Sequence, residues 1–447
     1  MTVSGANPNP ANPWLAYAMQ HQQPPLPSHP FAESDGYTAR PLPPPTEIFS
    51  QRSSERTGDL FERTAQPDTL EGVNQFAVGT TNVLTHQGSV ARNVVQQGGK
   101  GFNSYGSVGN ADQVLQDGSD MLNNATITGQ VGGVLQAGVN NINQLTLGEL
   151  VNKVIMSGQN TLNDANLATG AKKVTMQGEG SFSRLTTQEL IQLETDGADN
   201  LHQATVTGST QNVWLKGTGN TTQLFFADKL GVADLQGTGN DTTLHVTGDL
   251  GQAKLAGTQG QTTLVTKAAV GRLALEGDGH TGRVSLEGDN KKPTLTVFNG
   301  KNNTYDMLAT SAQHLVLRGD NNTLNIATGT LSEQAGKGLT ANRDDKADLG
   351  GTGTYSVDLG EGNDKVLIRE LSDTQGKQTA EVFGGSGVNH LLLEGEGWEA
   401  EQVDKDTIRY TKGEQSIVAH DFAPAQAVTT GSLTPTAFIN TSNLTNP

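Results

Sequence analysis

The sequence predicts an all-β protein, a single-stranded parallel β-solenoid (β-helix) with coils of about 20 residues and a disordered N-terminal arm. Three observations lead to this prediction: a glycine that recurs every 20 residues, positions spaced by two before it, and few aromatic residues, at 5%. A spacing of two is typical of a strand with one buried face. A fixed period near 20 is typical of stacked units that bury a continuous core only together.

The recurring residue is here called the marker glycine. Its copies are Gly98, Gly118, Gly138, Gly158, Gly178, Gly197, Gly217, Gly237, Gly257 and Gly277, with Gly197 one residue out of step. Four residues earlier lie the apolar residues Val94, Val114, Val134, Val154, Val174, Leu193, Val213, Ala233, Ala253 and Leu273. Two residues earlier, the same face carries Gln96, Gln116 and Gln136, followed by Met or Leu in most later copies. Both positions are expected to point into the coil.

A second strand is expected after each marker glycine. Apolar residues seven and nine positions later include Ala125 and Ile127, Leu145 and Leu147, Ala165 and Leu167, Ala204 and Val206, Leu224 and Phe226, and Leu244 and Val246. Turns of Gly, Asn, Asp and Thr separate these short strands. Each coil therefore has at least two strands, and the solenoid is expected over residues 73–328.

Asparagine recurs in the turns at two positions. Asn123, Asn143 and Asn163 lie five residues after a marker glycine, and Asn220 and Asn240 lie three residues after one. Amides stacked in this way can hydrogen-bond from coil to coil. Asn also tolerates the left-handed turn conformation, which would explain its recurrence without a ladder. Both interpretations remain open from the sequence.

The flanking segments lack the repeat. Residues 1–70 hold eleven prolines within their first 45 positions, which predicts a disordered or polyproline arm with an export role. Within it, Ser53–Ala65 is either a short helix or a linker. Residues 329–350 are expected to form a loop or insertion, 351–422 irregular β coils, and 423–447 a flexible tail without charged residues. An insertion at Lys291–Pro293 is expected to bulge from the solenoid.

Composition restricts the classes of function. The chain has no cysteine, which excludes thiolate metal sites and cysteine nucleophiles. A net charge of −17 disfavours nucleic acid and anionic membrane surfaces as partners. No apolar run is long enough for a membrane span. The first residues have no basic segment followed by an apolar one, so export without a cleaved Sec signal is expected.

The sharpest local motifs are LGEGNDKVL at 359–367 and GGSGVNHLL at 384–392. Both resemble the glycine-rich, hemolysin-type calcium-binding nonapeptide GGxGxDxUx of RTX proteins. The resemblance implies Ca²⁺ held by turn carbonyls and carboxylates. The matching positions are Gly360, Gly362, Asp364, Gly384, Gly385, Gly387 and Asn389.

Three departures separate these motifs from that family. Leu359 replaces the first glycine, Asn389 replaces an aspartate, and the copies lie 25 residues apart instead of nine. The alternative is that both motifs are tight turns of the solenoid. Calcium is the only cofactor that the sequence suggests.

The N-terminal region is similar to the export signals of type III effectors from plant-associated bacteria. It is polar, has Val3, and reaches its first acidic residue at Glu33. The uncharged C-terminal tail is instead similar to type I export signals of RTX proteins. Both similarities imply a secreted bacterial protein.

Three functions follow as expectations. The first is a secreted, non-enzymatic binding or structural surface, such as a type III effector or virulence factor, with a host protein or a cell-surface or matrix component as partner. The second is an extracellular, adhesin-like, calcium-binding RTX-type protein. The third is a polysaccharide-active β-helix enzyme. Against the third, neighbouring coils show no column of three carboxylates.

Overall fold

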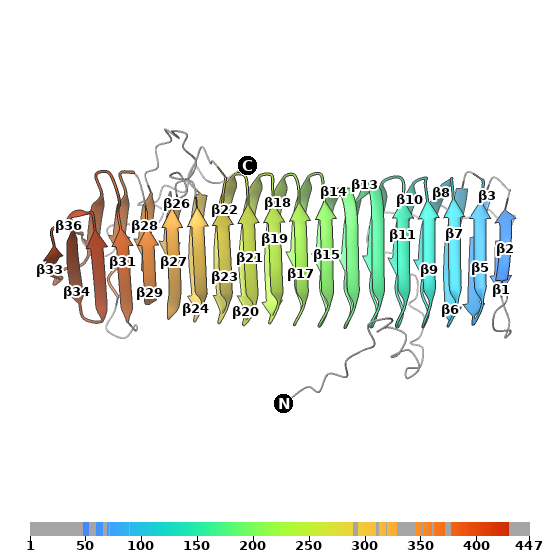
Figure 1. Ribbon diagram of the computed structural model, residues 1–447, viewed down its shortest axis with the longest axis horizontal. Coiled ribbons are helices and arrows are strands. Elements are labelled where there is room, and N and C mark those ends of the chain that lie inside the picture. The colour runs from blue at the N-terminus through green and yellow to red at the C-terminus, as the bar shows by residue number, and fades with distance from the viewer. Residues whose placement is uncertain are drawn as a thin grey trace, which may run out of the picture. The chain divides into compact units, whose positions relative to one another are not determined.

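The structure is a computed structural model that describes residues 48–52, 60–65, 69–70, 72–88, 90–288, 294–309, 313–318, 320–328, 345–350, 352–359, 362–371 and 377–428. All regular elements in these residues are strands, and they form a parallel β-solenoid (Figure 1). The predicted fold class is therefore confirmed. The described residues include no helix that is long and apolar enough to cross a membrane.

The chain divides into two compact units. The N-terminal unit comprises Met1–Ser209 with Asn220–Thr222, and the C-terminal unit comprises Thr210–Gly219 with Gln223–Pro447. In each unit the coils form two sheets. The strands that follow the marker glycines make the first sheet, and the strands that precede them make the second sheet.

The N-terminal unit contains β1 to β15. Its first sheet holds β2 (Leu60–Ala65), β5 (Thr81–His86), β7 (Phe102–Ser107), β9 (Leu122–Ile127), β11 (Ile142–Leu147) and β15 (Leu201–Val206). Its second sheet holds β1 (Ile48–Arg52), β3 (Thr69–Leu70), β4 (Gly72–Val78), β6 (Val90–Gly99), β8 (Asn110–Gln116), β10 (Val131–Gln136) and β12 (Val151–Met156). Two long strands, β13 (Leu162–Met176) and β14 (Phe182–Thr195), contribute to both sheets.

The C-terminal unit contains β16 to β36, apart from the first two residues of β17. Its first sheet holds β17 (Thr221–Phe226), β19 (Asp241–Val246), β21 (Gln261–Thr266), β23 (Thr281–Leu286), β25 (Thr304–Ala309), β27 (Asn322–Thr328), β29 (Gly353–Asp358), β31 (Gln378–Phe383) and β35 (Gln415–His420). Its second sheet holds β16 (Thr210–Leu215), β18 (Leu230–Thr238), β20 (Leu250–Thr258), β22 (Val270–Asp278), β24 (Thr294–Lys301), β26 (Gln313–Leu317), β28 (Lys346–Leu349), β30 (Lys365–Ile368), β32 (His390–Glu394) and β36 (Ala423–Val428).

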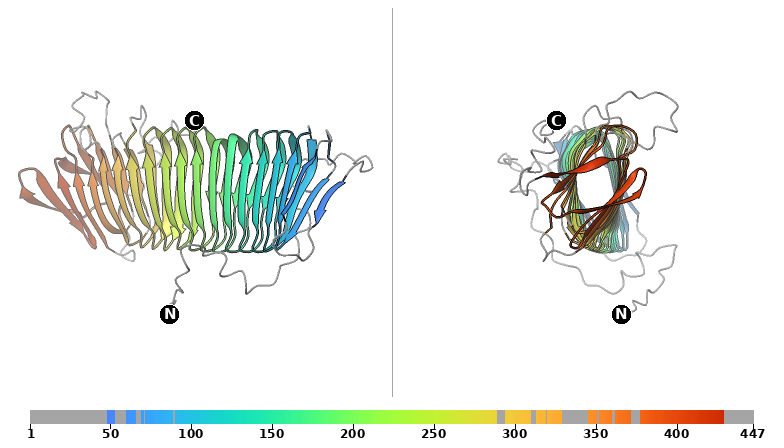
Figure 2. Two further views of the ribbon diagram at one scale, coloured as in Figure 1. Left: turned by 45° about the vertical axis from the view of Figure 1, so that its right-hand side comes forward. Right: turned by 90° about the vertical axis from the view of Figure 1, so that its left-hand side faces the viewer.

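An antiparallel hairpin ends the first sheet of the C-terminal unit. Strand β34 (Thr407–Lys412) pairs antiparallel with β35, and β33 (Glu399–Asp404) pairs antiparallel with β34. The end-on view shows the strands of this unit on two sides of the coil, with the last strands nearest the viewer (Figure 2). The coils are regular in parallel register up to this hairpin.

The predicted inward columns form the core. The residue four positions before the marker glycine is at most 2% exposed in every copy from Val94 to Leu273. The paired positions seven and nine residues after it are at most 3% exposed, from Ala125 and Ile127 to Leu244 and Val246. The alternating pattern of the sequence therefore gives the observed strand faces.

The marker glycines stack in one column, and at most of them a side chain would collide with the backbone of the preceding coil. A Cβ atom on Gly158 would lie 2.3 Å from the carbonyl oxygen of Gly138 in the preceding coil. The φ angle of Gly158 is +128°, which side chains also disfavour. The closeness of successive turns thus explains the recurrence of glycine.

Two buried ladders of amides run through the N-terminal unit. The Asn ladder joins Asn82, Asn103, Asn123, Asn143 and Asn163 by Nδ2 to Oδ1 bonds of 2.9–3.2 Å. The Gln ladder joins Gln75, Gln96, Gln116 and Gln136 by Nε2 to Oε1 bonds of 2.7–2.8 Å. The ladder interpretation is confirmed for Asn123, Asn143 and Asn163 and extends to two earlier coils.

For Asn220 and Asn240 the ladder interpretation is wrong. Their side chains bind the backbone: Nδ2 of Asn240 donates to the carbonyl oxygens of Gly217 and Gln236, at 3.2 and 3.0 Å. Nδ2 of Asn220 donates to the carbonyl oxygen of Gly197 at 3.0 Å. Three residues after the marker glycine the chain is still in the turn. There the side-chain amide lies closer to the backbone carbonyl of the preceding coil than to the next amide of its column.

The predicted boundaries need correction at the N-terminal side. Strands β1, β2 and β3 pair in parallel with β4, β5 and β6, so the described solenoid reaches back to Ile48 and does not start at residue 73. The helix interpretation of Ser53–Ala65 is wrong for Leu60–Ala65, which form β2. Residues 1–47 and 53–59 lie outside the described part of the chain.

Corrections also apply further along the chain. Within the segment 329–350 expected to be a loop, Lys346–Leu349 form β28, which pairs in register with β26. Within the expected tail, Ala423–Val428 form β36, which pairs with β32. Residues 329–344 and 429–447, and the expected bulge at Lys291–Pro293, lie outside the described residues.

Candidate functional site

The two candidate calcium residues with polar side chains point into the coil. The backbone N–H of Asp345 donates to Oδ1 of Asp364 at 2.7 Å, and the N–H of Asp364 donates to Oδ1 of Asn389 at 3.0 Å. Asp364 is 0% exposed and Asn389 is 2% exposed. Each side chain therefore bridges its own coil to the preceding one.

This bridge is a recurring element of the C-terminal unit. The N–H of His280 donates to Oδ1 of Asn303 at 2.9 Å, and the N–H of Asn303 donates to Oδ1 of Asn322 at 3.0 Å. Asp364 and Asn389 make the same contact in later coils. Asp364 differs by bringing a carboxylate to a position where these other coils have an amide.

The candidate glycines also behave as solenoid turns. A Cβ on Gly387 would lie 1.7 Å from the carbonyl oxygen of Gly362, as found for the marker glycines. Gly385 has a φ of +63°, and the N–H of Gly384 donates to the carbonyl oxygen of His420 at 3.0 Å. Gly360 lies outside the described residues. In the parts of the chain described, no three His, Asp or Glu side chains group closely enough to hold a metal ion.

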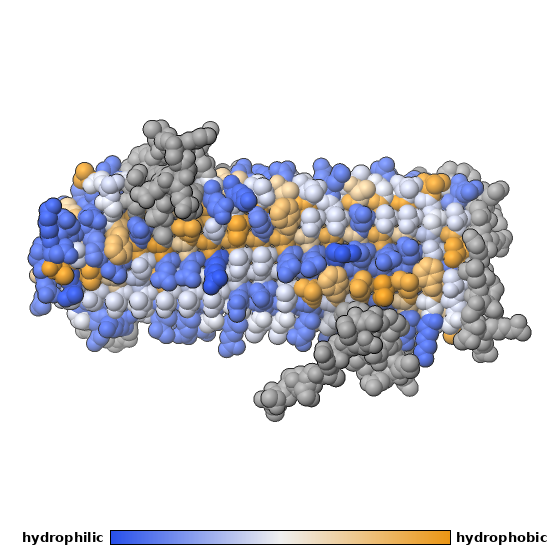
Figure 3. Space-filling view, in the orientation of Figure 1, coloured by the Kyte–Doolittle hydropathy of each residue, from blue (hydrophilic) through white to orange (hydrophobic). Residues whose placement is uncertain are grey.

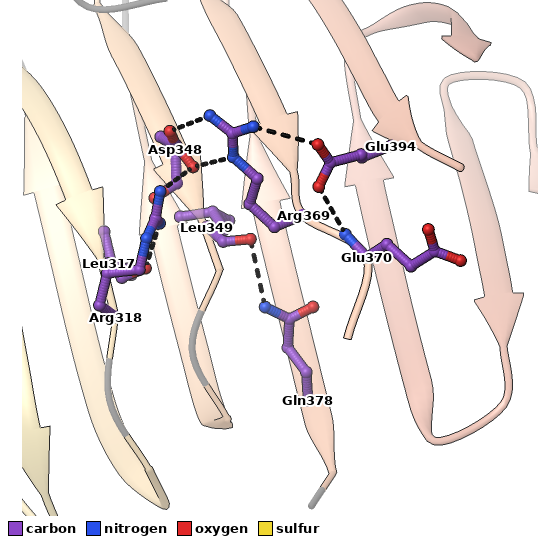
Figure 4. Close-up of polar contacts among 8 residues, drawn as sticks. All are labelled: Leu317, Arg318, Asp348, Leu349, Arg369, Glu370, Gln378 and Glu394. Carbon is purple, nitrogen blue, oxygen red and sulfur yellow. Dashed lines mark hydrogen bonds and ion pairs between the residues drawn. The ribbon is translucent and has the colours of Figure 1, made fainter. Parts of the chain in front are cut away.

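A charge cluster lies on the second sheet of the C-terminal unit (Figure 4). Arg369 donates to both carboxylate oxygens of Asp348, at 2.9 and 2.7 Å, and to Glu394 at 3.2 Å. Arg318 donates to Asp348 at 2.8 Å. The cluster therefore links four successive strands, from the end of β26 to β32.

This charge cluster is largely removed from water. The side chain of Asp348 is 0% exposed and that of Arg369 is 12% exposed. Burial by itself lowers the pKa of Arg369, but the bonds to Asp348 and Glu394 outweigh it and raise the pKa above its ordinary value. Every carboxylate here faces a guanidinium, so the cluster acts as a structural clamp between coils.

A groove lies on the outer face of the first sheet of the C-terminal unit and is here called the outer groove. It has a volume of about 550 Å³ and crosses β21, β23, β25, β27, β29 and β31. Figure 3 shows this face, where hydrophobic residues form a band beside polar ones. The outer groove lies entirely within the C-terminal unit.

Two outward columns line the outer groove. The first is polar and holds Arg283, Asp306, Asn325 and Ser356 in successive coils. Its amide and carboxylate are paired, since Nδ2 of Asn325 donates to Oδ1 of Asp306 at 2.8 Å. The second column is mixed and holds Val265, Ser285, Leu308, Asp358 and Phe383.

Aromatic residues stand beside histidines along this second column. Phe383 stacks on His420, with ring centroids 4.4 Å apart and planes 4° apart. Nε2 of His420 lies 3.1 Å from Oε1 of Glu381. Phe225 meets His245 edge to face at 5.2 Å. The outer groove thus lies between two aromatic pairs.

The carboxylates of the outer groove are widely spaced. Asp306 and Asp358 belong to different columns and are two coils apart. Two coil steps and two residues along a strand separate their backbones by roughly 12 Å.

Sequence reasoning did not find the charge cluster or the outer groove. Asp348 lies in a segment assigned to a loop, so its strand neighbours Arg318 and Arg369 could not be recognised. Outward residues such as Leu308 and Phe383 follow no repeat, because only inward positions are constrained by the neighbouring coils. The only available signal was the apolar character of some outward positions.

Comparison with known proteins adds no relative. No family model, curated protein or solved structure matches this chain. The chain belongs to the β-solenoids by its architecture.

Proposed function

We propose that this protein is a secreted, non-enzymatic bacterial β-solenoid that presents a binding surface to a host protein or to a cell-surface component. The observation that carries the proposal is the outer groove, an open concavity across six coils of a fully paired sheet. Neighbouring coils show no column of three carboxylates, which supports binding over catalysis.

The secretion part of the proposal rests on the N-terminal similarity to type III effectors. The first described strand begins at Ile48, so residues 2–47 can be deleted without removing a described strand. The full chain and this deletion are expressed in a strain with a type III apparatus and in a matched strain without it. Secretion should need both the apparatus and residues 2–47. Equal secretion from both strains would contradict the type III route.

The buried carboxylate of Asp364 supports calcium binding as a second candidate function. Asp364 places a buried carboxylate where Asn303, Asn322 and Asn389 place amides. The variant Asp364→Asn keeps the bridge to the Asp345 N–H but removes the charge. Calorimetric titration of the full chain with Ca²⁺ should give heat that Asp364→Asn abolishes. Heat that is unchanged in the variant, or no heat in either protein, would refute calcium binding at Asp364.

A further inference from the structure

We infer that the outer groove binds an uncharged polysaccharide chain, laid along the stack of coils. This inference rests on the proposed role of the outer face as a binding surface. Five coil steps of about 4.8 Å separate β21 from β31, so the outer groove extends about 24 Å. That length suits several units of an extended chain better than a single small molecule.

The backbone of the outer groove is not available to a ligand. Strands β23, β25, β27 and β29 each pair in parallel with the coil on either side. A peptide therefore cannot join this face as an added strand, which is a principal way in which sheets bind extended peptides. Recognition must come from side chains alone.

The side chains have the mixture that sugar rings require. Asp306, Asn325, Ser356 and Asp358 supply carboxylate, amide and hydroxyl groups that can bond to many hydroxyls. Val265, Leu308 and Phe383 supply apolar surface against which the C–H faces of sugar rings can pack. Asp358 shares a column with the apolar side chains and the other polar side chains lie in the adjacent column, so one polysaccharide chain can contact both kinds.

Charge selects among polysaccharides. Asp306 and Asp358 line the outer groove and Glu381 lies beside it, whereas Arg283 is the only Lys or Arg side chain in the lining. The whole chain has a net charge of −17. Acidic polysaccharides would be repelled by both the local and the total charge. An uncharged polysaccharide meets no such penalty.

The test is affinity electrophoresis of the full chain in gels that contain galactomannan, hydroxyethylcellulose or polygalacturonate. At least one of the two neutral polymers should retard the protein, and polygalacturonate should not. Phe383→Ala removes the stacking surface, and Ser356→Arg fills the outer groove without altering the core. Each variant should weaken retardation at least tenfold. Trp214→Ala, which removes an aromatic side chain from the second sheet, should leave retardation unchanged.

Several results would overturn the inference. These are retardation by polygalacturonate as strong as by a neutral polymer, retardation that both outer-groove variants leave intact, and no retardation by any of the three polymers. Capture of a defined host protein through the outer groove, without polysaccharide binding, would also overturn it while supporting the proposed function. Release of reducing ends from a bound neutral polymer would confirm the ligand class and refute the non-enzymatic function.

Discussion

The N-terminal and C-terminal units stack coils with the same marker glycine, yet they fill their interiors differently. The N-terminal unit buries the Gln ladder and the Asn ladder. At the position of the Gln ladder, the C-terminal unit has a column of Leu215, Leu235, Leu255 and Leu275. Coil spacing is therefore set by the glycine column and the turns, and the interior can be either polar or apolar.

The amide ladders and the leucine column should differ in how well they tolerate a single substitution. An amide in a ladder is satisfied only by its neighbours, so the loss of one member leaves partners unpaired in a buried place. A leucine in an apolar column loses only its own contacts. The ladders should therefore tolerate replacement of all their members better than replacement of one.

The charged residues of the two units give the largest expected contrast. Arg369→Ala should lower the free energy of unfolding by about 3–5 kcal/mol, because Asp348 is buried and would lose its main partner. Arg184→Ala breaks the exposed pair with Asp164 and should cost less than about 1 kcal/mol. Urea unfolding of both variants measures the contrast. Similar losses would mean that the charge cluster is not a clamp.

The marker glycines give the next contrast. Gly158→Ala should cost about 3 kcal/mol, because the new Cβ would meet the carbonyl oxygen of Gly138 at a positive φ. Gly257→Ala should cost less than about 1 kcal/mol, because its Cβ would meet the His280 ring, 3.0 Å away, before any backbone atom. The melting temperatures of the two variants, measured in parallel with that of the unchanged protein, test this contrast. A larger loss at Gly257 would contradict the assigned close approach.

Replacements in the Gln ladder test the difference in tolerance itself. Gln116→Leu should cost about 2 kcal/mol, since Oε1 of Gln96 and an N–H of Gln136 lose their partner. Leucine at all four positions from Gln75 to Gln136 should cost less than the single change. Urea unfolding of both variants is the measurement. A cost that grows with each added leucine would show that the ladder contributes net stability.

Acid should weaken the N-terminal unit through His202. Burial lowers the pKa of His202 to about 4, with a smaller opposing effect of Asp196. The unfolded chain binds the proton near pH 6.5, so stability is full above that pH and falls down to about pH 4. Between pH 7 and pH 5 the loss should be about 2 kcal/mol.

Hydrogen exchange resolved over the two units provides the measurement for His202. In His202→Asn the N-terminal unit should lose most of this pH dependence. The C-terminal unit should keep its own dependence, because burial also lowers the pKa of His280, and that of His314 to about 4. Unchanged dependence in the variant's N-terminal unit would refute the role of His202.

Inward residues of the repeat could be predicted from the sequence because each coil constrains the next at a fixed spacing. Val114 and Leu147 could be placed in this way, whereas Asn123 and Asn143 were assigned to turns and lie inside the strands β9 and β11. The backbone bonds of Asn220 and Asn240 could not be predicted, since a turn offers several partners at similar distance. Strands β1, β2 and β28 were missed because they pair with the solenoid without following its repeat.

The candidate site was harder to predict for a related reason. The motifs at Asp364 and Asn389 were noticed through their glycines, and those glycines also serve the stacking of turns. Phe383 and Leu308 point outward, where the neighbouring coil accepts nearly any side chain, and Arg369 bonds to Asp348 in a strand that does not follow the repeat. Their grouping depends on which coils lie side by side, and an irregular coil length hides that from the sequence.

The ladders also affect how the chain finds its register during folding. Nearly identical coils can pair one coil out of place at little cost, which is a hazard of all repeats. The Gln ladder ends at Gln136, where Met156 takes over, whereas the Asn ladder continues to Asn163. A pairing that skips the coil of Gln116 and Asn123 would cost one bond in each ladder, whereas a pairing that skips the coil of Met156 and Asn163 would cost a bond in the Asn ladder alone. Because the Gln ladder and the Asn ladder end in different coils, the number of ladder bonds lost depends on which coil is out of place, and this favours the native register.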